Sequence, residues 1–258
     1  MRVTLLMLLV LAGAARAQQA THYVLHRPGY PRGEERVVPV SWRTNLVYAQ
    51  FFDLDRGTNY LDYSLYLNDA TAISAPSWAG RTIYLDGTNN VVFAPDSASL
   101  DMTNQITINC WIKTIGDATF APLAGKWENG VANTELSYAF YQDNAIPPHL
   151  YWQCSQDGTT ADRIYGVTVD AVKSNVWMMA TAVWTPPDQF RIFMDSTNAA
   201  ITTNGAGNVA SVYNSASKLR LGKWGTSAGA YRGDLDAVTI YDRALTAVEI
   251  TNLYTRGR

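Results

Sequence analysis

The chain has 258 residues, a formal net charge of −2 and a charged fraction of only 16%. A mildly acidic surface attracts neither nucleic acid nor an anionic membrane, so neither is expected as a partner. The chain is rich in tyrosine and tryptophan, residues that favour strands, and its length fits one large β-domain.

The N-terminal segment has the pattern of a secretory signal peptide. Arg2 precedes an apolar run over residues 5–11, and Ala15-Arg16-Ala17 matches the small-x-small rule for cleavage. The apolar run is too short to span a bilayer, which disfavours a membrane anchor. The sequence therefore predicts a signal peptide over residues 1–17. It also predicts a mature protein that is secreted to the extracellular space or the cell surface and inserts in no membrane.

Residues 18–45 are predicted to form an extended N-terminal arm. They contain three prolines, charges of both signs and the short apolar pair Val37-Val38. Such a composition is typical of a connecting segment rather than of a domain. Two roles stay open for the arm: it lies along the body of the protein, or it adds a strand to a neighbouring copy.

From Leu46 onward, short apolar or alternating runs recur between turn residues such as Asp-Gly and Pro-Pro. This spacing predicts an all-β sandwich or barrel. Near the C-terminus a strand over residues 234–241 is followed by a helix over Thr246–Tyr254. Thr246 is the expected N-cap, and Glu249 completes a capping box.

The two cysteines, Cys110 and Cys154, each alternate with apolar residues in a predicted strand, so both thiols are expected to point into the core. An exported protein can keep a disulfide. The bond requires the two Cα atoms to lie within about 7 Å of each other. The sequence leaves a Cys110–Cys154 disulfide and two buried free thiols as equal alternatives. The three histidines show no ligand spacing, so zinc chemistry is not expected.

Several segments resemble, in order, the laminin G-like (LamG-like) domains of the concanavalin A-like jelly-roll class. They are LVYAQFFDLDRG, RTIYLDG with the strand QITINCWIK, LAGKW, VWMMATAVWTPPDQFRIFMDS and YRGDLDAVTIYDRALTAVEI. The last segment is the most specific, because its strand, its Arg-Ala-Leu and its capping Glu recur at the offsets of the family. The resemblance implies a LamG-like domain over residues 46–258, with the fold of a two-sheet antiparallel jelly-roll sandwich and a short C-terminal helix.

One departure from the family pattern lies at Asp195-Ser196, where relatives usually have Asp-Gly. A glycine at the second position usually provides a positive φ. Ser196 is therefore expected to fit this turn less well than glycine.

The resemblance also implies candidate ligands for a structural calcium ion, which relatives often hold. Asp236 is the first candidate, Asp86 the second and Asp53 the third. Calcium prefers carboxylate and carbonyl oxygens supplied by loops. The alternative for Asp86 is an ordinary turn residue before Gly87. The alternative for Asp236 is an acceptor for backbone amides at the rim of a sheet.

Ligand binding is the usual function of the family, and a sugar is bound by aromatic faces together with polar side chains. The predicted ligand-binding residues are Trp127, Tyr151, Tyr165 and Trp224, with Tyr141 as a further candidate. Ordinary packing is the alternative for each of these aromatic residues.

Enzyme activity is not expected. A retaining glycosidase needs two carboxylates about 5.5 Å apart, and no strand shows the run of alternating carboxylates that would supply them. The primary interpretation is an exported, non-catalytic protein for carbohydrate binding or cell adhesion, with a glycan or another surface polymer as partner. The first alternative is a structural subunit of an extracellular assembly or filament, which joins copies of itself by strand addition through the arm. The second alternative is a glycoside hydrolase.

Overall fold

The computed structural model describes residues 22–25, 36–39, 43–52, 57–78, 80, 82–116, 120–128, 134–205, 209–225 and 229–257. The predicted signal peptide, most of the predicted arm and the calcium candidate Asp53 lie outside these residues. Within the described part of the chain, no helix combines the length and the apolar character that a membrane span requires.

Residues 1–42 form one unit and residues 43–258 a second one, and each is described by itself. In the first unit, β1 (His22–Leu25) and β2 (Arg36–Pro39) form an antiparallel two-stranded sheet. The predicted arm therefore contains a pair of strands, which the sequence pattern did not indicate.

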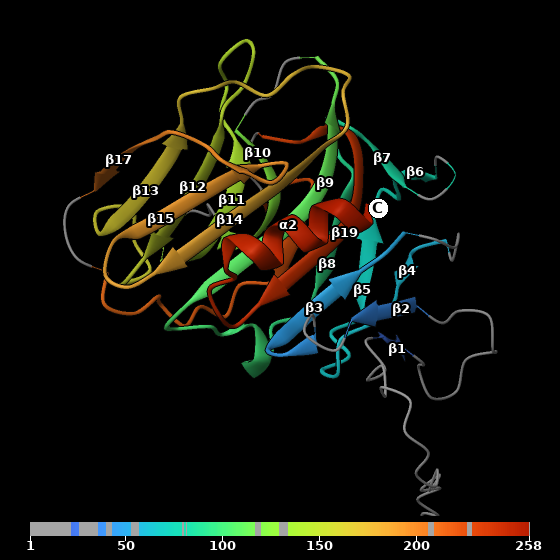
Figure 1. Cartoon of the computed structure of the whole chain (residues 1–258), viewed down its shortest axis with the longest axis horizontal. Helices are drawn as coiled ribbons and strands as arrows, with labels where there is room; N and C mark the ends of the chain where they lie inside the picture. Colours follow the sequence, from blue (N-terminus) through green and yellow to red (C-terminus); the bar gives the residue numbers. More distant parts are fainter. Residues whose placement is uncertain are drawn as a thin grey trace, which may run out of the picture. The chain divides into compact units, whose positions relative to one another are not determined.

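The second unit consists of two antiparallel sheets (Figure 1). The nine-stranded sheet has the order β17-β13-β12-β11-β10-β18-β8-β5-β4. Its strands are β4 (Asn59–Tyr60), β5 (Ala70–Ile73), β8 (Val91–Ala94), β10 (Ala121–Glu128), β11 (Glu135–Gln142), β12 (Leu150–Ser155), β13 (Arg163–Thr168), β17 (Ile201–Gly205) and β18 (Leu219–Leu221).

The eight-stranded sheet has the order β16-β15-β14-β9-β19-β7-β6, with β3 paired to β19. Its strands are β3 (Leu46–Gln50), β6 (Ser77–Trp78), β7 (Ile83–Asp86), β9 (Ile106–Thr114), β14 (Met178–Thr185), β15 (Gln189–Met194), β16 (Thr197–Asn198) and β19 (Arg232–Tyr241). A single 3-10 turn, η1 (Ala98–Leu100), follows β8. This arrangement confirms the predicted two-sheet antiparallel jelly-roll sandwich.

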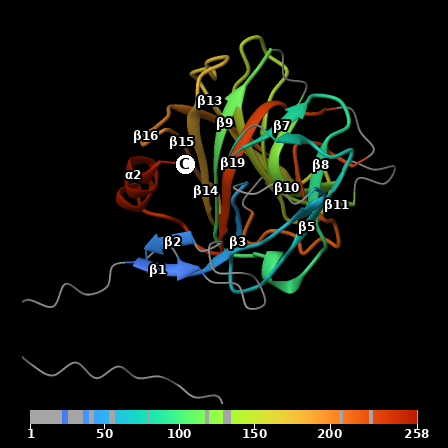
Figure 2. The ribbon, with the colours of Figure 1, turned by 90° about the vertical axis from the view of Figure 1, so that its right-hand side faces the viewer.

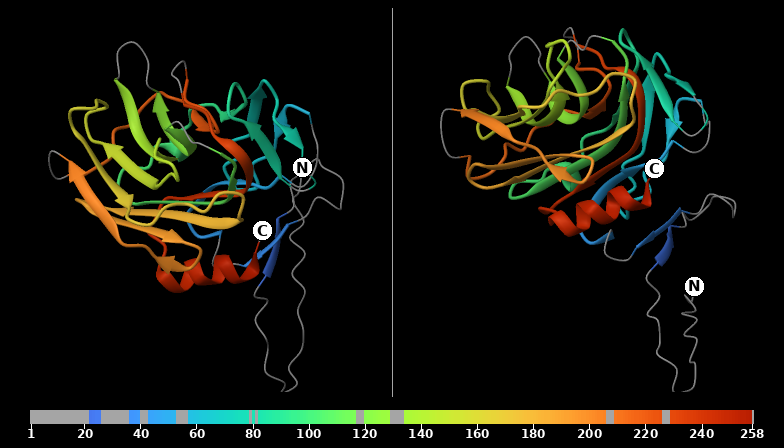
Figure 3. Two further views of the ribbon diagram at one scale, coloured as in Figure 1. Left: turned by 90° about the horizontal axis from the view of Figure 1, so that it is seen from above. Right: turned by 45° about the horizontal axis from the view of Figure 1, so that its top comes forward.

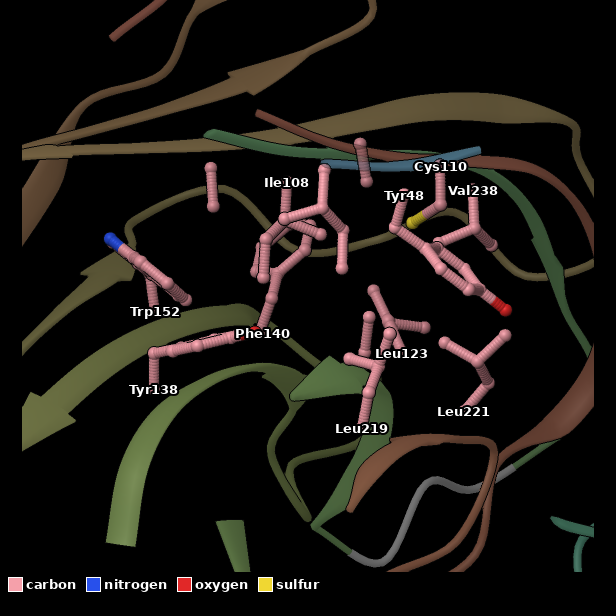
Figure 4. Close-up of a cluster of buried hydrophobic side chains, with 14 of the residues drawn as sticks. Tyr48, Ile108, Cys110, Leu123, Tyr138, Phe140, Trp152, Leu219, Leu221 and Val238 are labelled. Atoms are coloured by element: carbon pink, nitrogen blue, oxygen red, sulfur yellow. The ribbon is translucent and has the colours of Figure 1, made fainter. Parts of the chain in front are cut away.

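The main core lies between the two sheets and is built by alternate residues of facing strands. Ile108 and Val238 enter it from the eight-stranded sheet, while Phe140, Trp152 and Leu221 enter it from the nine-stranded sheet (Figure 4). Because every second residue of each strand faces the core, the residues between them face outward. This alternation decides which side chains are free for function.

Cys110 and Cys154 are both buried in the main core, as predicted, but both thiols are free. The disulfide that the sequence left open is therefore absent from this structure. Cys110 lies on β9 and Cys154 on β12, so the two residues belong to facing sheets. Facing sheets pack about 10 Å apart, so a disulfide between them requires the two strands to approach each other more closely than usual.

The C-terminal helix α2 (Ala247–Arg256) covers the outer face of the eight-stranded sheet (Figures 1 and 2). Its buried residues are Ile250 and Leu253, and the Tyr254 ring stacks on Trp111 of β9 with centroids 5.8 Å apart. The predicted capping box is present, because Thr246 and Glu249 exchange hydrogen bonds. Figure 3 shows the helix on one side of the sandwich, so α2 leaves the outer face of the nine-stranded sheet uncovered.

The turn between β15 and β16 adapts to its serine in a way that the family pattern did not indicate. Asp195, rather than Ser196, has the positive φ, at 59°. Aspartate tolerates this left-handed region better than most residues do. Ser196 itself has no positive φ, so the reason for expecting glycine to fit better at this position does not apply.

Candidate functional site

The outer face of the nine-stranded sheet carries a hollow of about 170 Å³, which we call the aromatic hollow. The residues that line it are Phe120, Trp127, Tyr141, Tyr151, Gln153, Arg163, Tyr165 and Trp224. All four predicted ligand-binding residues and the further candidate Tyr141 are among them. Their part in ligand binding stays a prediction, but the fold brings them to one place.

Strand register explains why these residues meet. Tyr141 of β11 lies opposite Tyr151 of β12, and Gln153 of β12 lies opposite Tyr165 of β13. Residues paired across antiparallel strands point to the same face. Their sequence neighbours, such as Trp152, enter the main core instead. The outward positions of three adjacent strands thus form one polar and aromatic surface.

The aromatic rings form a continuous row. The Trp224 and Tyr141 centroids lie 5.8 Å apart in an edge-to-face contact, and the Tyr141 and Tyr151 rings stack at 5.1 Å. Tyr165 follows at 5.6 Å from Tyr151. Such spacings are favourable for aromatic pairs. Because the rings support one another, they offer a pre-formed surface for the apolar face of a sugar.

Four members of the hollow are buried, namely Trp127, Tyr141, Gln153 and Trp224, and the two tryptophans act mainly as its support. Trp127 and Trp224 pack with Leu136, Ala139 and Tyr141 in a small apolar cluster that is separate from the main core. The Trp224 indole nitrogen donates a hydrogen bond to the Phe120 carbonyl oxygen at 2.5 Å. Tyr151 and Tyr165 are only partly buried, so their rings are the ones that a ligand can reach.

Polar groups surround the exposed rings. The Tyr141 hydroxyl donates to Gln153 Oε1 at 3.2 Å, and Asn204 Nδ2 donates to the Tyr165 hydroxyl at 3.0 Å. The Arg163 guanidinium lies over the Tyr165 ring, 5.7 Å from its centroid. Burial raises the pKa of Tyr141 and of Tyr151 above the ordinary tyrosine value, so both hydroxyls are protonated at neutral pH.

Gln153, Arg163 and Phe120 were missed as site residues in the sequence. A signal for the first two was present: Gln153 is two residues from Tyr151, and Arg163 is two residues from Tyr165. Residues at that spacing share a face of a strand. Phe120 precedes β10 and carried no comparable pattern.

No carboxylate is among the described residues that line the aromatic hollow. Two nearby acidic residues have other partners. Glu128 forms an ion pair with Arg220 at 3.0 Å. Asp143 accepts hydrogen bonds from the His149 backbone N–H at 2.8 Å and lies 3.0 Å from the His149 ring nitrogen Nδ1. The described lining therefore contains no pair of acids of the kind that glycoside hydrolysis requires.

The calcium candidates Asp236 and Asp86 have structural contacts. Buried Asp236 accepts hydrogen bonds from the backbone N–H groups of Ala237 at 2.7 Å and Phe52 at 3.5 Å. Asp86 accepts from the Thr88 N–H at 2.8 Å in a turn.

The strand register also separates these two carboxylates. Asp86 lies opposite Arg232, four positions before Asp236 on β19, which is roughly 13 Å along a strand. The two residues therefore do not fit one shared ion, and among the described residues no three His, Cys, Asp or Glu side chains gather in a metal-binding group. Calcium binding stays a prediction.

A second hollow of about 480 Å³ lies between residues 170–178 and the β15–β16 hairpin. It is larger, but Trp177 is its sole described aromatic residue, beside Met178 and Met194. Its described lining has no row of rings, so the aromatic hollow is the better candidate for sugar binding.

Residues 86–251 match the family model of the concanavalin A-like lectin/glucanases superfamily. No curated protein sequence matches the chain. Among solved structures, the fold is similar to domain 4 of AbnA, a GH43 extracellular arabinanase from Geobacillus stearothermophilus, in complex with arabinotriose. That match has a TM-score of 0.58 and 16% identity, and it covers 81% of this chain and 98% of that domain.

Two further solved structures have a similar fold. The binding domain of Paraclostridial Mosquitocidal Protein 1 matches with a TM-score of 0.60 and 15% identity over 83% of this chain and 53% of that domain. The Trypanosoma rangeli sialidase in complex with sialic acid matches with a TM-score of 0.63 and 15% identity over 88% of this chain and 35% of that enzyme. This chain thus spans about half of the toxin domain and about a third of the sialidase. At these identities the likeness concerns the fold alone.

Proposed function

Since this chain belongs to the concanavalin A-like lectin/glucanase superfamily, we propose that it is an exported, non-catalytic protein that binds glycan at the cell surface or matrix. The single observation that carries the proposal is the row of rings Tyr141, Tyr151 and Tyr165 on the outer face of the nine-stranded sheet. A pyranose has one apolar face and a rim of hydroxyls. The partly buried rings suit the face, and the polar groups beside them suit the rim.

Two further points support binding rather than catalysis. The described lining of the hollow has no carboxylate to act as acid, base or nucleophile. The AbnA domain, 98% of which is covered by this chain, was solved in complex with arabinotriose. Export is proposed from the N-terminal sequence, which has the pattern of a signal peptide.

A polysaccharide panel tests this function directly. Affinity electrophoresis of the mature protein, in gels that contain one neutral or acidic polysaccharide each, should show retardation by at least one polymer. Tyr151→Ala and Tyr165→Ala should each weaken that binding about tenfold, because each removes one ring from the accessible surface. Tyr66→Ala is the matched control, since Tyr66 is a tyrosine that is 55% exposed and lies outside the hollow.

Either of two results would overturn the proposal. Binding that survives loss of both rings would place the ligand elsewhere. Release of reducing ends or of unsaturated sugars from a bound polymer would make the protein an enzyme.

One observation favours a second role, assembly through the arm. The arm contains the strands β1 and β2, and strand structure is what strand addition requires. Light scattering of the mature chain with and without residues 18–42 tests this role, and the role requires oligomers that disappear with the deletion.

A further inference from the structure

The polar groups of the aromatic hollow are mostly hydrogen-bond donors. Arg163 carries five N–H donors and no acceptor. The Gln153 carboxamide oxygen already accepts from the Tyr141 hydroxyl, and the Gln153 NH₂ group adds two N–H donors. The Tyr165 oxygen accepts from Asn204, which leaves its O–H proton to be donated. The Tyr151 hydroxyl can donate as well as accept, so the excess of donors rests on Arg163 and Gln153.

Acceptors are scarce by comparison. The described lining contains no carboxylate, and the Phe120 carbonyl oxygen already accepts from the Trp224 indole. A neutral sugar presents hydroxyls that both donate and accept. A site with donors in excess is therefore better matched to a ligand group that only accepts.

Arg163 differs from Arg220 and Arg243 in its surroundings. Arg220 forms an ion pair with Glu128 at 3.0 Å, and Arg243 forms one with Glu249 at 2.7 Å. Arg163 is half-buried, yet its described contact is the Tyr165 ring, and no described carboxylate pairs with it. A guanidinium in this position has its planar fork available for an incoming anion.

We infer that the aromatic hollow takes an acidic glycan, with Arg163 binding an anionic oxygen group on the sugar while Tyr151 and Tyr165 hold the sugar ring. This inference rests on the proposed glycan-binding function. The anionic group is a carboxylate or a sulfate ester, because both present paired oxygens to a guanidinium. Gln153 and the tyrosine hydroxyls supply neutral donors beside it.

The charge of Arg163 acts across the hollow. Burial raises the pKa of Tyr151, and the positive charge of Arg163 opposes that rise, so the guanidinium influences the hydroxyl at the centre of the row. Asp143 is the nearby negative charge that raises the same pKa, but its oxygens are occupied by His149 and by the Ala145 N–H. The chain as a whole is mildly acidic, with a net charge of −2, so general attraction of polyanions is not expected. Binding of an acidic polymer would therefore be due to Arg163 and the neighbouring donors of the aromatic hollow.

The test uses pairs of polymers that differ in charge. Polygalacturonate is compared with its methyl ester, and dextran sulfate with dextran, by titration calorimetry at fixed salt. The variants are Arg163→Gln, Arg163→Lys and Tyr151→Ala. Arg191→Gln is the matched control, because Arg191 also lies over an aromatic ring, Phe193 at 5.8 Å, but belongs to the other sheet.

The wild-type protein should bind at least one acidic polymer about tenfold or more tightly than its uncharged partner. Arg163→Gln should abolish this preference, and Arg163→Lys should recover only part of it, since lysine keeps the charge without the planar fork. Arg191→Gln should bind as the wild type does. A preference for polygalacturonate over its methyl ester would identify the anionic group as a carboxylate. A preference for dextran sulfate over dextran would identify it as a sulfate ester.

The two ways of failing are distinct. If an uncharged polymer binds as well as its acidic partner, and Tyr151→Ala weakens binding while Arg163→Gln does not, the acidic preference is overturned and the glycan-binding function stands. If no polymer binds, or if Tyr151→Ala leaves binding unchanged, the proposed function fails and the inference fails with it.

Discussion

Replacing Lys126 by methionine should destabilise the domain by about 3 kcal/mol. The Lys126 side chain is 0% exposed, and its Nζ lies 2.5 Å from Asp96 Oδ1 and also pairs with Asp101. These contacts attach β10 to the segment around η1. Breaking a buried ion pair costs about 3 to 5 kcal/mol, because the remaining charge loses its partner. The low end applies here, since the Asp96 side chain is 39% exposed and regains water.

Urea unfolding followed by tryptophan fluorescence measures the loss. Lys113→Met is the control, because the Lys113–Asp234 pair is longer, at 3.8 Å, and Lys113 is partly exposed, so it should cost less than about 1 kcal/mol. Adding Asp101→Leu to Lys126→Met should recover part of the loss by removing one unpaired carboxylate. If Lys126→Met lowers the free energy of unfolding no more than Lys113→Met does, the buried Lys126 ammonium does not attach β10 to the segment around η1.

Three other predictions concern a glycine, the helix cap and the thiols. Gly233 has φ 144°, and a Cβ there would lie 2.3 Å from the Lys113 carbonyl oxygen, so Gly233→Ala should lower the melting temperature by about 5 °C or more. Hydrogen bonding from Arg243 lowers the pKa of Glu249 to about 2, so the stability that Glu249 contributes is present above about pH 4.5 and is lost as the pH falls toward 2. Because the Glu249 side chain is 26% exposed and solvent screens its pair with Arg243, Glu249→Gln should cost less than about 1 kcal/mol at pH 7 and nothing below pH 2 in urea titrations. Cys110 and Cys154 should resist thiol reagents in the native protein, since burial raises both thiol pKa values, and both should react once it is unfolded without reductant.

Each of these predictions has a result that contradicts it. An unchanged melting temperature for Gly233→Ala would mean that β19 and β9 separate readily at this point. If Glu249→Gln lowered the free energy of unfolding equally at every pH, the charge of the Glu249 carboxylate would not contribute to stability. A count of no free thiols after unfolding would show that the two cysteines are bonded.

The strands, the capped helix and the sandwich were predictable because their signals are local. The pattern around Thr246 and Glu249 specifies a helix start within four residues, and alternating runs such as QITINCWIK specify strands with one buried face. The strand pair of the arm was missed, because Val37-Val38 is too short a run to show a period.

The candidate site was predictable only in part. Tyr151 and Tyr165 were identified as outward aromatic residues within their own strands. Arg163 shares a strand face with Tyr165 within β13, but its position near Tyr151 and Tyr141 depends on the register of β13 against β12 and of β12 against β11, which no single segment encodes. The sequence could not decide between a Cys110–Cys154 disulfide and two free thiols for the same reason. Each strand pattern shows a thiol that faces the core, but the distance between the two strands is a property of the assembled fold.

Nuclear magnetic resonance can locate glycan binding on the outer face of the nine-stranded sheet. A polysaccharide fragment that binds the mature protein is titrated into isotope-labelled protein, and the shifted backbone amides are mapped. We expect the largest shifts on β11, β12 and β13 around Tyr141, Tyr151 and Tyr165, and no shift at α2. Shifts confined to the second hollow around Trp177, or to the helix-covered sheet, would contradict this expectation.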